Sequence, residues 1–229
     1  MKKNCAEVCT TIKEVGILPA IRVSTSEDAH FAAESVAAGG IPIVEITMTV
    51  AGCVDLIAHL IRYHPKMLVG AGTVLDVDTA RQCVDAGAHF LTSPGFVPQV
   101  VAFAKEKGVA VLPGAMTPTE VIAAWGAGAD FVKVFPCAQI GGDSYIRALK
   151  APFPQIPLIA AGGVNQQNVT NFILAGATAI GIGSELVPRE AIERRQASRI
   201  KELTKRFVRF VQEARETAAA HAGSATPHN

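Results

Sequence analysis

The chain has 229 residues, of which 49% are apolar and 18% charged, and its formal net charge at neutral pH is +1. This size and composition are typical of one packed α/β domain and exclude a disordered chain. The balanced charge predicts no binding to nucleic acid or to an anionic membrane. No apolar stretch approaches the ~20 residues of a membrane span, and the first residues lack the apolar core of a secretory signal, so we expect a cytoplasmic protein with no membrane partner.

Eight short apolar runs recur along the chain, and each predicts a buried strand. The runs are PAIRVS (19–24), PIVEIT (42–47), MLVGAGT (67–73), HFLTSPG (89–95), VAVLPGAM (109–116), FVKVFP (131–136), PLIAAGG (157–163) and AIGIGS (179–184). A solenoid is excluded because no consensus motif repeats with them. Since both faces of each strand are apolar and a helical segment follows each one, we predict a parallel (β/α)8 TIM barrel. A doubly wound open sheet is the alternative.

The segments between the runs carry helix start and stop signals. Ser24 or Ser26 is expected to start a helix ahead of Glu27, and residues 117–120 (Thr-Pro-Thr-Glu) read as a capping box with proline in the first turn. Small-residue turns at 37–40, 85–88, 126–129 and 174–177 each place a glycine where a left-handed helix end is expected.

The two ends of the chain predict additional helices. Residues 1–16, with Cys5, Cys9, Ile12 and Val15 on one stripe, are expected to form a helix that caps the barrel bottom. A long charged helix is expected from Pro188 to about Ala220, with an apolar stripe of Ile200, Leu203, Phe207 and Phe210. We therefore predict a single barrel domain over 1–220 and a flexible tail over 221–229.

The cysteines and histidines give little sign of a metal centre. The five cysteines are scattered, and reduced thiols are the default expectation. Cys5 and Cys9 are spaced for one helix face, but no second Cys/His pair completes four ligands, so a metal site there is only a weak option. Only His89 of the six histidines starts a predicted strand, and no His/Asp/Glu cluster has ligand spacing, which argues against a metal-dependent enzyme.

Lys133 lies inside the apolar run at 131–136, where a charged side chain is unexpected. Burial disfavours the charged form of an amine, and a neutral lysine amine is a nucleophile toward carbonyl carbon. The position therefore predicts a lysine that forms a Schiff base. The alternative is a structural lysine that reaches solvent at the strand end or pairs with a buried acid.

Other candidate residues lie at the carboxyl ends of the predicted strands, where TIM barrels carry out their chemistry. Glu45 is a second charge in a buried strand and is predicted to transfer protons, unless it is only a structural partner of Lys133 or Arg22. Arg22 and Thr73 could hold a substrate carboxylate, although Arg22 is equally consistent with an exposed strand-end residue. Thr47, at the end of the strand that carries Glu45, is a further candidate substrate contact.

Glycine pairs follow the last two predicted strands and suggest a phosphate site. Gly162–Gly163 and Gly183–Ser184 lie in the two loops that bind phosphate in many barrels, and backbone N–H groups reach an anion where no side chain intervenes. Plain turns are the alternative explanation for these glycines.

Seven motifs occur in order between residues 16 and 188. They are Ile-Val-Glu-Ile-Thr-Met-Thr (43–49), Val-Gly-Ala-Gly-Thr-Val (69–74), Ser-Pro-Gly (93–95), Leu-Pro-Gly (112–114), Phe-Val-Lys-Val-Phe-Pro (131–136), Ala-Pro-Phe-Pro (151–154) and Gly-Gly-Val-Asn (162–165). With these motifs the chain resembles the class I aldolases of 2-keto-3-deoxy-6-phosphogluconate (KDPG) and 4-hydroxy-2-oxoglutarate (KHG).

The resemblance implies a homotrimeric TIM barrel that acts on a small 2-keto acid without a metal or organic cofactor. It implies Schiff-base formation at Lys133 and proton transfer by Glu45. The implied substrate contacts are Arg22 and Thr73 for the pyruvate carboxylate, Pro94 and Phe135 as apolar walls, and Gly162, Gly163 and Ser184 for phosphate. The expected reaction is the cleavage of KDPG to pyruvate and glyceraldehyde 3-phosphate.

Two positions depart from the family pattern. Many members carry arginine where this chain has Thr49, so Arg22 is expected to take over its role, as in members with Ile/Leu-Arg on the first strand. Many also carry Pro-Thr where this chain has Ala160–Ala161, and that threonine hydroxyl lies near the phosphate. An aldolase of non-phosphorylated acids such as KHG is therefore an alternative. A phosphosugar isomerase or epimerase, or a non-catalytic ligand-binding barrel, are alternatives of a different class.

Overall fold

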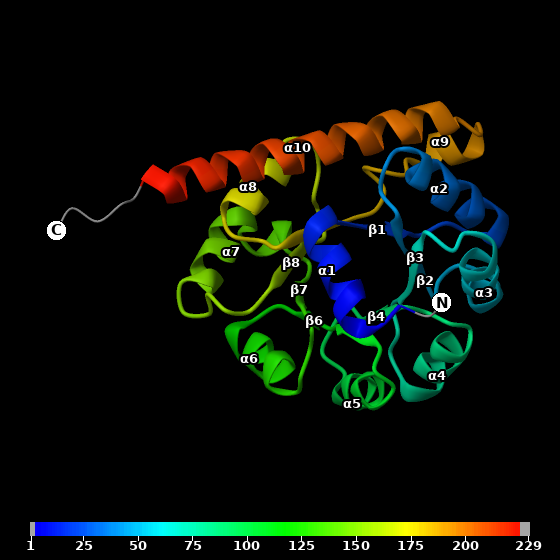
Figure 1. Cartoon of the computed structure of the whole chain (residues 1–229), viewed down its shortest axis with the longest axis horizontal. Helices are drawn as coiled ribbons and strands as arrows, with labels where there is room; N and C mark the ends of the chain where they lie inside the picture. Colours follow the sequence, from blue (N-terminus) through cyan, green and yellow to red (C-terminus); the bar gives the residue numbers. More distant parts are fainter. Residues whose placement is uncertain (1–2, 225–229) are drawn as a thin grey trace.

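The structure, a computed structural model, describes residues 3–224, with side chains through His221 (Figure 1). Within these residues one parallel sheet runs in the order β5-β4-β3-β2-β1-β9-β8-β7-β6. Its strands are β1 (Ile17–Ile21), β2 (Ile43–Thr47), β3 (Leu68–Gly72), β4 (Phe90–Thr92), β5 (Ala110–Leu112), β6 (Gly114–Ala115), β7 (Val132–Val134), β8 (Leu158–Ala161) and β9 (Ala179–Ile182). Each predicted run overlaps a strand, although β1 begins two residues before the first run, and the predicted TIM barrel is confirmed.

The fifth predicted strand is divided in two by Pro113. β5 pairs with β4, β6 pairs with β7, and the single intervening proline joins the two edges of the sheet. Proline has no N–H to contribute to a strand ladder. Its carbonyl still accepts a hydrogen bond of 2.9 Å from the N–H of Lys133. The barrel therefore closes beside Lys133. β5 and β6 together occupy one of the eight strand positions around the barrel.

Helices surround the sheet, as Figure 1 shows. They are α1 (Cys5–Val15), α2 (Ser26–Ala38), α3 (Cys53–Tyr63), α4 (Val77–Asp85), α5 (Pro98–Glu106), α6 (Pro118–Gly126), the 3-10 helix η1 (Ala138–Ile140), α7 (Gly142–Lys150), α8 (Val169–Leu174), α9 (Arg189–Glu193) and α10 (Ala197–Ser224). The predicted glycine turns are confirmed, since Gly40, Gly87, Gly128 and Gly176 all have φ between 94° and 105°.

The predicted N-cap residues can be compared with the structure at the starts of α6 and α2. The predicted box at α6 is confirmed: the Thr117 hydroxyl accepts from the Glu120 N–H, and the Glu120 carboxylate accepts from the Thr117 N–H. At α2 the prediction of Ser24 or Ser26 is wrong by one residue, because the Thr25 hydroxyl accepts from the N–H of Asp28 at 3.1 Å. Three neighbouring hydroxyl side chains were equally suited to this position, and the backbone geometry selects the middle one.

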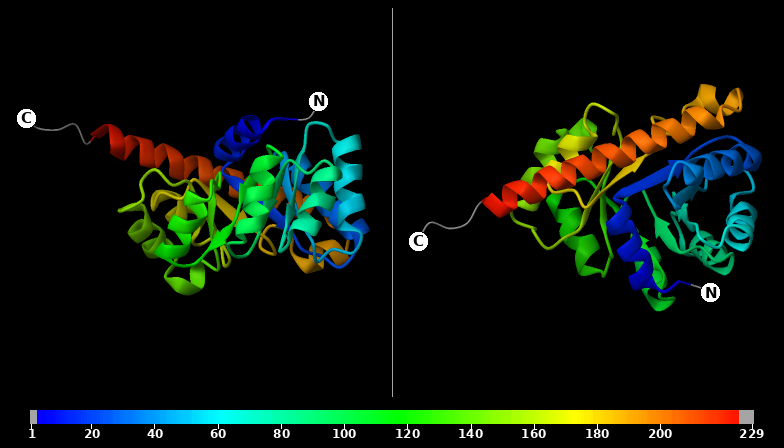
Figure 2. Two further views of the ribbon diagram at one scale, coloured as in Figure 1. Left: turned by 90° about the horizontal axis from the view of Figure 1, so that it is seen from below. Right: turned by 45° about the horizontal axis from the view of Figure 1, so that its top comes forward.

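The predicted N-terminal helix covers one end of the barrel, at which the strands begin. α1 packs on β5 and β9, and the carbonyl of Gly16 accepts from the N–H of Ile180 at the start of β9. Figure 2 shows α1 lying beyond the ends of the strands. Val8 and Ile12 are the fully buried residues of its apolar face.

The predicted C-terminal helix is split. α9 ends at Glu193, Arg195 has a left-handed φ of 48°, and α10 starts at Ala197. The Arg195 guanidinium makes ion pairs of 2.9 Å with Glu27 and Asp28 of α2, which hold the chain in this break.

α10 lies across α2 and α8 (Figures 1 and 2). In its predicted stripe Ile200 and Phe207 are fully buried and Leu203 and Phe210 are partly buried. α10 continues to Ser224, four residues beyond the expected end, and the rest of the predicted tail, 225–229, lies outside the described residues. Across residues 3–224, no helix combines the length and apolar character needed to cross a bilayer.

Candidate active site

Lys133 of β7 and Glu45 of β2 meet inside the barrel. The Lys133 Nζ lies 3.5 Å from each carboxylate oxygen of Glu45, and the two residues are 9% and 1% exposed. Charge-assisted hydrogen bonds of this type are normally ~2.7–2.9 Å long, so the contact is not that of a tight structural ion pair. Both residues line the cavity described below.

The carboxylate of Glu45 is accommodated because the neighbouring strand lacks a side chain. A Cβ atom placed on Gly72 of β3 would overlap with Oε1 of Glu45 and would lie 2.7 Å from its Cδ and Cγ atoms. Gly70, which is paired with Glu45 in the sheet, similarly leaves room for the ring of Phe90. The predicted strand motif at 69–74 thus supplies the volume in which the Glu45 side chain lies.

A cavity of about 690 Å³ opens at the carboxyl ends of the strands on this side of the barrel. This volume suits a small organic substrate. Its lining includes eight of the residues predicted from the sequence: Arg22, Glu45, Lys133, Phe135, Gly162, Gly163, Gly183 and Ser184. The structure therefore brings together the predicted nucleophile, proton-transfer group, carboxylate-binding arginine and phosphate turns.

Three predicted residues do not line this cavity. Thr47 is fully buried, and its hydroxyl donates to the Ile21 carbonyl at 3.1 Å and shares a 2.7 Å hydrogen bond with Thr49. Thr73 follows β3 with a φ of 62°, a strained conformation for a β-branched residue. Pro94 is exposed after β4. Thr73 and Pro94 follow β3 and β4, strands of the other half of the barrel mouth that contribute no lining residue, whereas Thr47 belongs to β2, the strand of Glu45.

Arg22 projects from the end of β1 and is exposed. Among residues 3–224 no acidic side chain forms an ion pair with it. A guanidinium without an acidic partner has two parallel N–H donors free to bind the carboxylate of a substrate.

The turn after β8 has the features of an anion-binding loop. Gly162 and Gly163 have φ values of 84° and 80°. Their carbonyls accept from the Ala138 N–H at 3.0 Å and from the Asn168 amide at 2.8 Å. Within the described part of the chain, the N–H groups of both glycines and of Ser184 donate to no other residue. Free N–H groups on two adjacent turns form a site that favours negative charge.

The lining residues that the sequence analysis did not single out include Asp28, Arg189 and Glu193. Arg189 donates to Glu193 at 2.6 Å, and this hydrogen bond raises the pKa of the arginine above its usual range. Asp28 is paired with Arg195. Arg189, a basic residue at the start of the first helix after the last strand, carried a signal that could have identified it. Asp28 and Glu193 lie further inside helices and carry no such signal.

The expectation that no His/Asp/Glu cluster has ligand spacing is wrong. His30 and Glu34 of α2 lie near His64 after α3, with Glu34 oxygens 3.9 Å from His30 Nδ1 and 3.6 Å from His64 Nε2. The grouping depends on two helices that pack side by side, which spacing along the chain does not reveal. It does not line the cavity.

Comparison with known proteins identifies relatives that match most of the chain. Residues 8–203 match the family described as KDPG and KHG aldolase. The chain is 30% identical to the 2-dehydro-3-deoxy-phosphogluconate aldolase of Pseudomonas aeruginosa, over 94% of this chain and 98% of that protein. It is 32% identical to the KHG/KDPG aldolase of Escherichia coli strain K12, over 90% of this chain and 97% of that protein.

A solved structure supports the same assignment. The fold matches the KDPG aldolase from Legionella pneumophila, in which pyruvate was captured as a covalent carbinolamine intermediate. The TM-score is 0.80 at 31% identity, and the match covers 86% of this chain and 96% of that one.

Proposed function

The chain belongs to the KDPG and KHG aldolase family and is a class I aldolase, and we propose that its principal substrate is KDPG, cleaved reversibly to pyruvate and glyceraldehyde 3-phosphate. The observation that carries this proposal is the single cavity in which the Lys133 amine faces the Glu45 carboxylate, with free N–H groups of the glycine turns in the same lining.

In the proposed reaction the Lys133 amine adds to the ketone carbon of the substrate, and the resulting carbinolamine loses water to give an iminium ion. The iminium withdraws electrons from the bond between the third and fourth carbons. As that bond breaks, Glu45 takes the proton of the 4-hydroxyl group and the aldehyde leaves. Glu45 then protonates the enamine carbon, and water releases pyruvate from Lys133. General acid–base catalysis of this kind contributes about 10²–10⁴-fold to a rate.

Binding is proposed to use both ends of the substrate. Arg22 holds the pyruvate carboxylate, and Phe135, whose ring centroid lies 6.0 Å from Lys133 Nζ, forms an apolar wall. Gly162, Gly163, Gly183 and Ser184 hold the phosphate through backbone N–H groups and one hydroxyl. Thr73 and Pro94 bound the substrate from the other half of the mouth, and Thr47 contributes by holding Thr49 in place.

We also propose that the protein is a cytoplasmic homotrimer. Family resemblance supports this, and Leu75, Met116 and Ile122 are large apolar side chains that are 44–55% exposed and therefore available to an interface. Light scattering during gel filtration measures the assembly, and cell fractionation measures the location.

The nucleophile is tested by reducing the protein with borohydride in the presence of pyruvate. One pyruvyl mass increment is expected, on the peptide that contains Lys133, and Lys133→Ala should lose both the increment and turnover. Lys150 is the matched control, because burial lowers its pKa and makes it another amine with a raised neutral fraction. Labelling of Lys150, or activity in Lys133→Ala, contradicts the proposed role.

KHG is the second candidate substrate, favoured by Ala160 and Ala161, which leave the phosphate turn without a hydroxyl at that position. Comparison of kcat/KM for KDPG and KHG decides between the two. A higher value for KDPG supports phosphate binding by the turns, whereas an equal or reversed preference makes the protein an aldolase of non-phosphorylated acids.

A further inference from the structure

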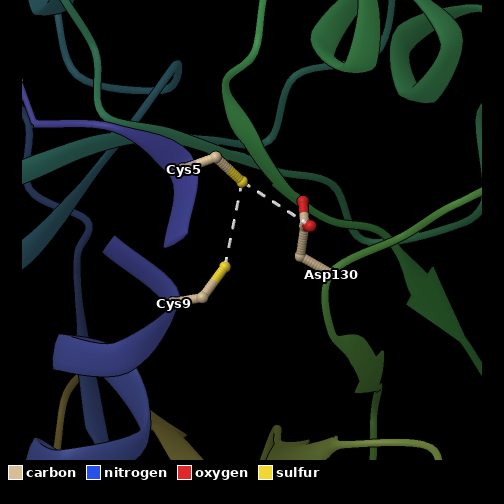
Figure 3. Close-up of side chains that lie close together, drawn as sticks. All are labelled: Cys5, Cys9 and Asp130. Carbon is tan, nitrogen blue, oxygen red and sulfur yellow. Dashed lines mark hydrogen bonds between the residues drawn. The ribbon is translucent and has the colours of Figure 1, made fainter. Parts of the chain in front are cut away.

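Two thiols and a carboxylate converge at the end of the barrel away from the cavity (Figure 3). Cys5 and Cys9 lie one turn apart on α1, and Asp130 lies two residues before β7 begins. Cys5 Sγ is 4.0 Å from Cys9 Sγ and 3.6 Å from Asp130 Oδ1. The sequence offered only the two thiols at this site, since Asp130 is 125 positions from Cys5 along the chain.

These distances match those required around a tetrahedral metal ion. With Zn–S bonds of ~2.3 Å and a Zn–O bond of ~2.0 Å, two sulfurs should lie about 3.8 Å apart and a sulfur and an oxygen about 3.5 Å apart. Two of the distances in the protein, 4.0 and 3.6 Å, are close to these values, and the third, from Cys9 Sγ to the Asp130 carboxylate, is within 4.8 Å. We propose that Cys5, Cys9 and Asp130 bind one Zn²⁺ ion, with the fourth position taken by solvent.

The carboxylate is already oriented for this role. Asp130 Oδ2 accepts a hydrogen bond of 2.9 Å from the N–H of Val111, and this leaves Oδ1 directed at Cys5. A fixed outer contact of this kind orients metal ligands in proteins. The Lys105 ammonium also approaches Oδ1, at 3.1 Å. Two thiolates and a carboxylate around Zn²⁺ leave one negative charge, which this ammonium neutralises.

The thiols bind the ion in competition with protons. Burial raises the pKa of Cys9 to about 12 and also raises the pKa of Cys5, and the charge of Asp130 adds to both shifts. Lys105 of α5 and Lys13 of α1 act in the opposite direction on Cys5 and Cys9 respectively. Zn²⁺ binds thiolates, so the ion displaces the thiol protons when it binds.

A metal ion at this site connects α1 to the wall of the barrel. Cys5 and Cys9 belong to the first helix, whereas Asp130 is linked through Val111 to β5 and directly precedes the strand of Lys133. A metal ion that binds this arrangement only in the folded chain stabilises it by mass action.

The test uses the full-length, reduced, metal-free protein and two direct measurements. Zinc titration should give one ion per chain, and free zinc at a hundred times Kd should raise Tm by about 5–10 °C. Cobalt(II) should give a tetrahedral spectrum with a thiolate charge-transfer band. Cys5→Ser, at the start of α1, and Asp130→Asn, which keeps an acceptor for Val111, should each weaken binding at least tenfold. Cys83→Ala is the control cysteine variant and should bind normally.

The His30–Glu34–His64 group of α2 and α3 supplies the decisive comparison. The proposal is overturned if zinc does not bind, if the cobalt complex lacks the thiolate band, or if Cys5→Ser and Cys9→Ser bind with unchanged affinity. It is equally overturned if binding is lost in a His30→Gln, His64→Gln double variant and retained in the cysteine variants. None of these measurements depends on aldolase activity.

Discussion

Gly72→Ala should disable proton transfer without replacing a reacting group. The added Cβ atom would overlap with the Glu45 carboxylate and lie 2.7 Å from its carboxyl carbon. Normal contacts between such atoms are about 3.5–4.0 Å long, so the carboxylate must move by about 1 Å. Glu45 is 1% exposed and cannot turn into solvent. Any accommodation therefore changes its position relative to Lys133.

The expected effect has two separable parts. A displacement of about 1 Å in a catalytic group costs on the order of 10²-fold in rate, and crowding of a packed core costs about 1–3 kcal/mol of unfolding free energy. The three atoms nearest to the new methyl group all belong to Glu45, so borohydride trapping of pyruvate at Lys133 should persist. Gly72→Ala should thus separate imine formation, which survives, from cleavage, which falls.

The assay follows both steps in one preparation. Solvent exchange of the pyruvate methyl protons, measured by NMR in D₂O, reports proton transfer, and mass spectrometry after borohydride reduction reports the imine. Gly126→Ala is the matched control, because no atom lies within 4 Å of its added Cβ. If folded Gly72→Ala exchanges pyruvate protons within about threefold of wild type, far less than the ~10²-fold expected, the assignment of Glu45 is refuted.

Three further outcomes are expected. Glu45→Gln should still be trapped with pyruvate but lose about 10²–10⁴-fold in proton exchange, and exchange within tenfold of wild type would make Glu45 structural. Ala161→Thr should raise kcat/KM for KDPG by at most about tenfold, the value of one hydrogen bond; a larger gain would show that the glycine turns bind phosphate poorly. Thr117→Ala should lower the unfolding free energy in urea by about 1 kcal/mol, and an unchanged midpoint would contradict the cap at α6. Hydrogen bonds from the backbone N–H groups of Met116 and Thr117 lower the pKa of Glu120 below 4.5. The carboxylate of Glu120 therefore contributes its full stabilisation above pH 4.5, and this stabilisation is lost as pH falls through the lowered pKa. The urea midpoints of wild type and Glu120→Gln should accordingly converge in acid.

The barrel was predictable because its signals are local. Each apolar run is a short continuous segment that overlaps one strand, or two in the run at 109–116, and Lys133 and Glu45 were found because a charge interrupts such a run. Because the carboxyl ends of parallel strands lie at the same face of a barrel, Lys133 and Glu45 could be grouped with Arg22 and the glycine turns.

The remaining features depend on contacts between distant segments. Asp130 joins Cys5 and Cys9, and His64 joins His30 and Glu34, only after the chain has folded. The break before α10 contains no glycine or proline, and Arg195 takes its left-handed conformation with its ion pairs to α2. No periodicity within the segment itself could predict such effects.

The side chain of Arg215 in α10 donates to the carbonyls of Lys13 and Thr178, and so ties the last helix of the protein to the end of the first. Gly16 provides the room, since a Cβ there would overlap with the guanidinium. During synthesis, α1 and the early strands leave the ribosome long before α10 is made. The closed end of the barrel can therefore be completed only after α10 has been made, and until then α1 lacks this contact.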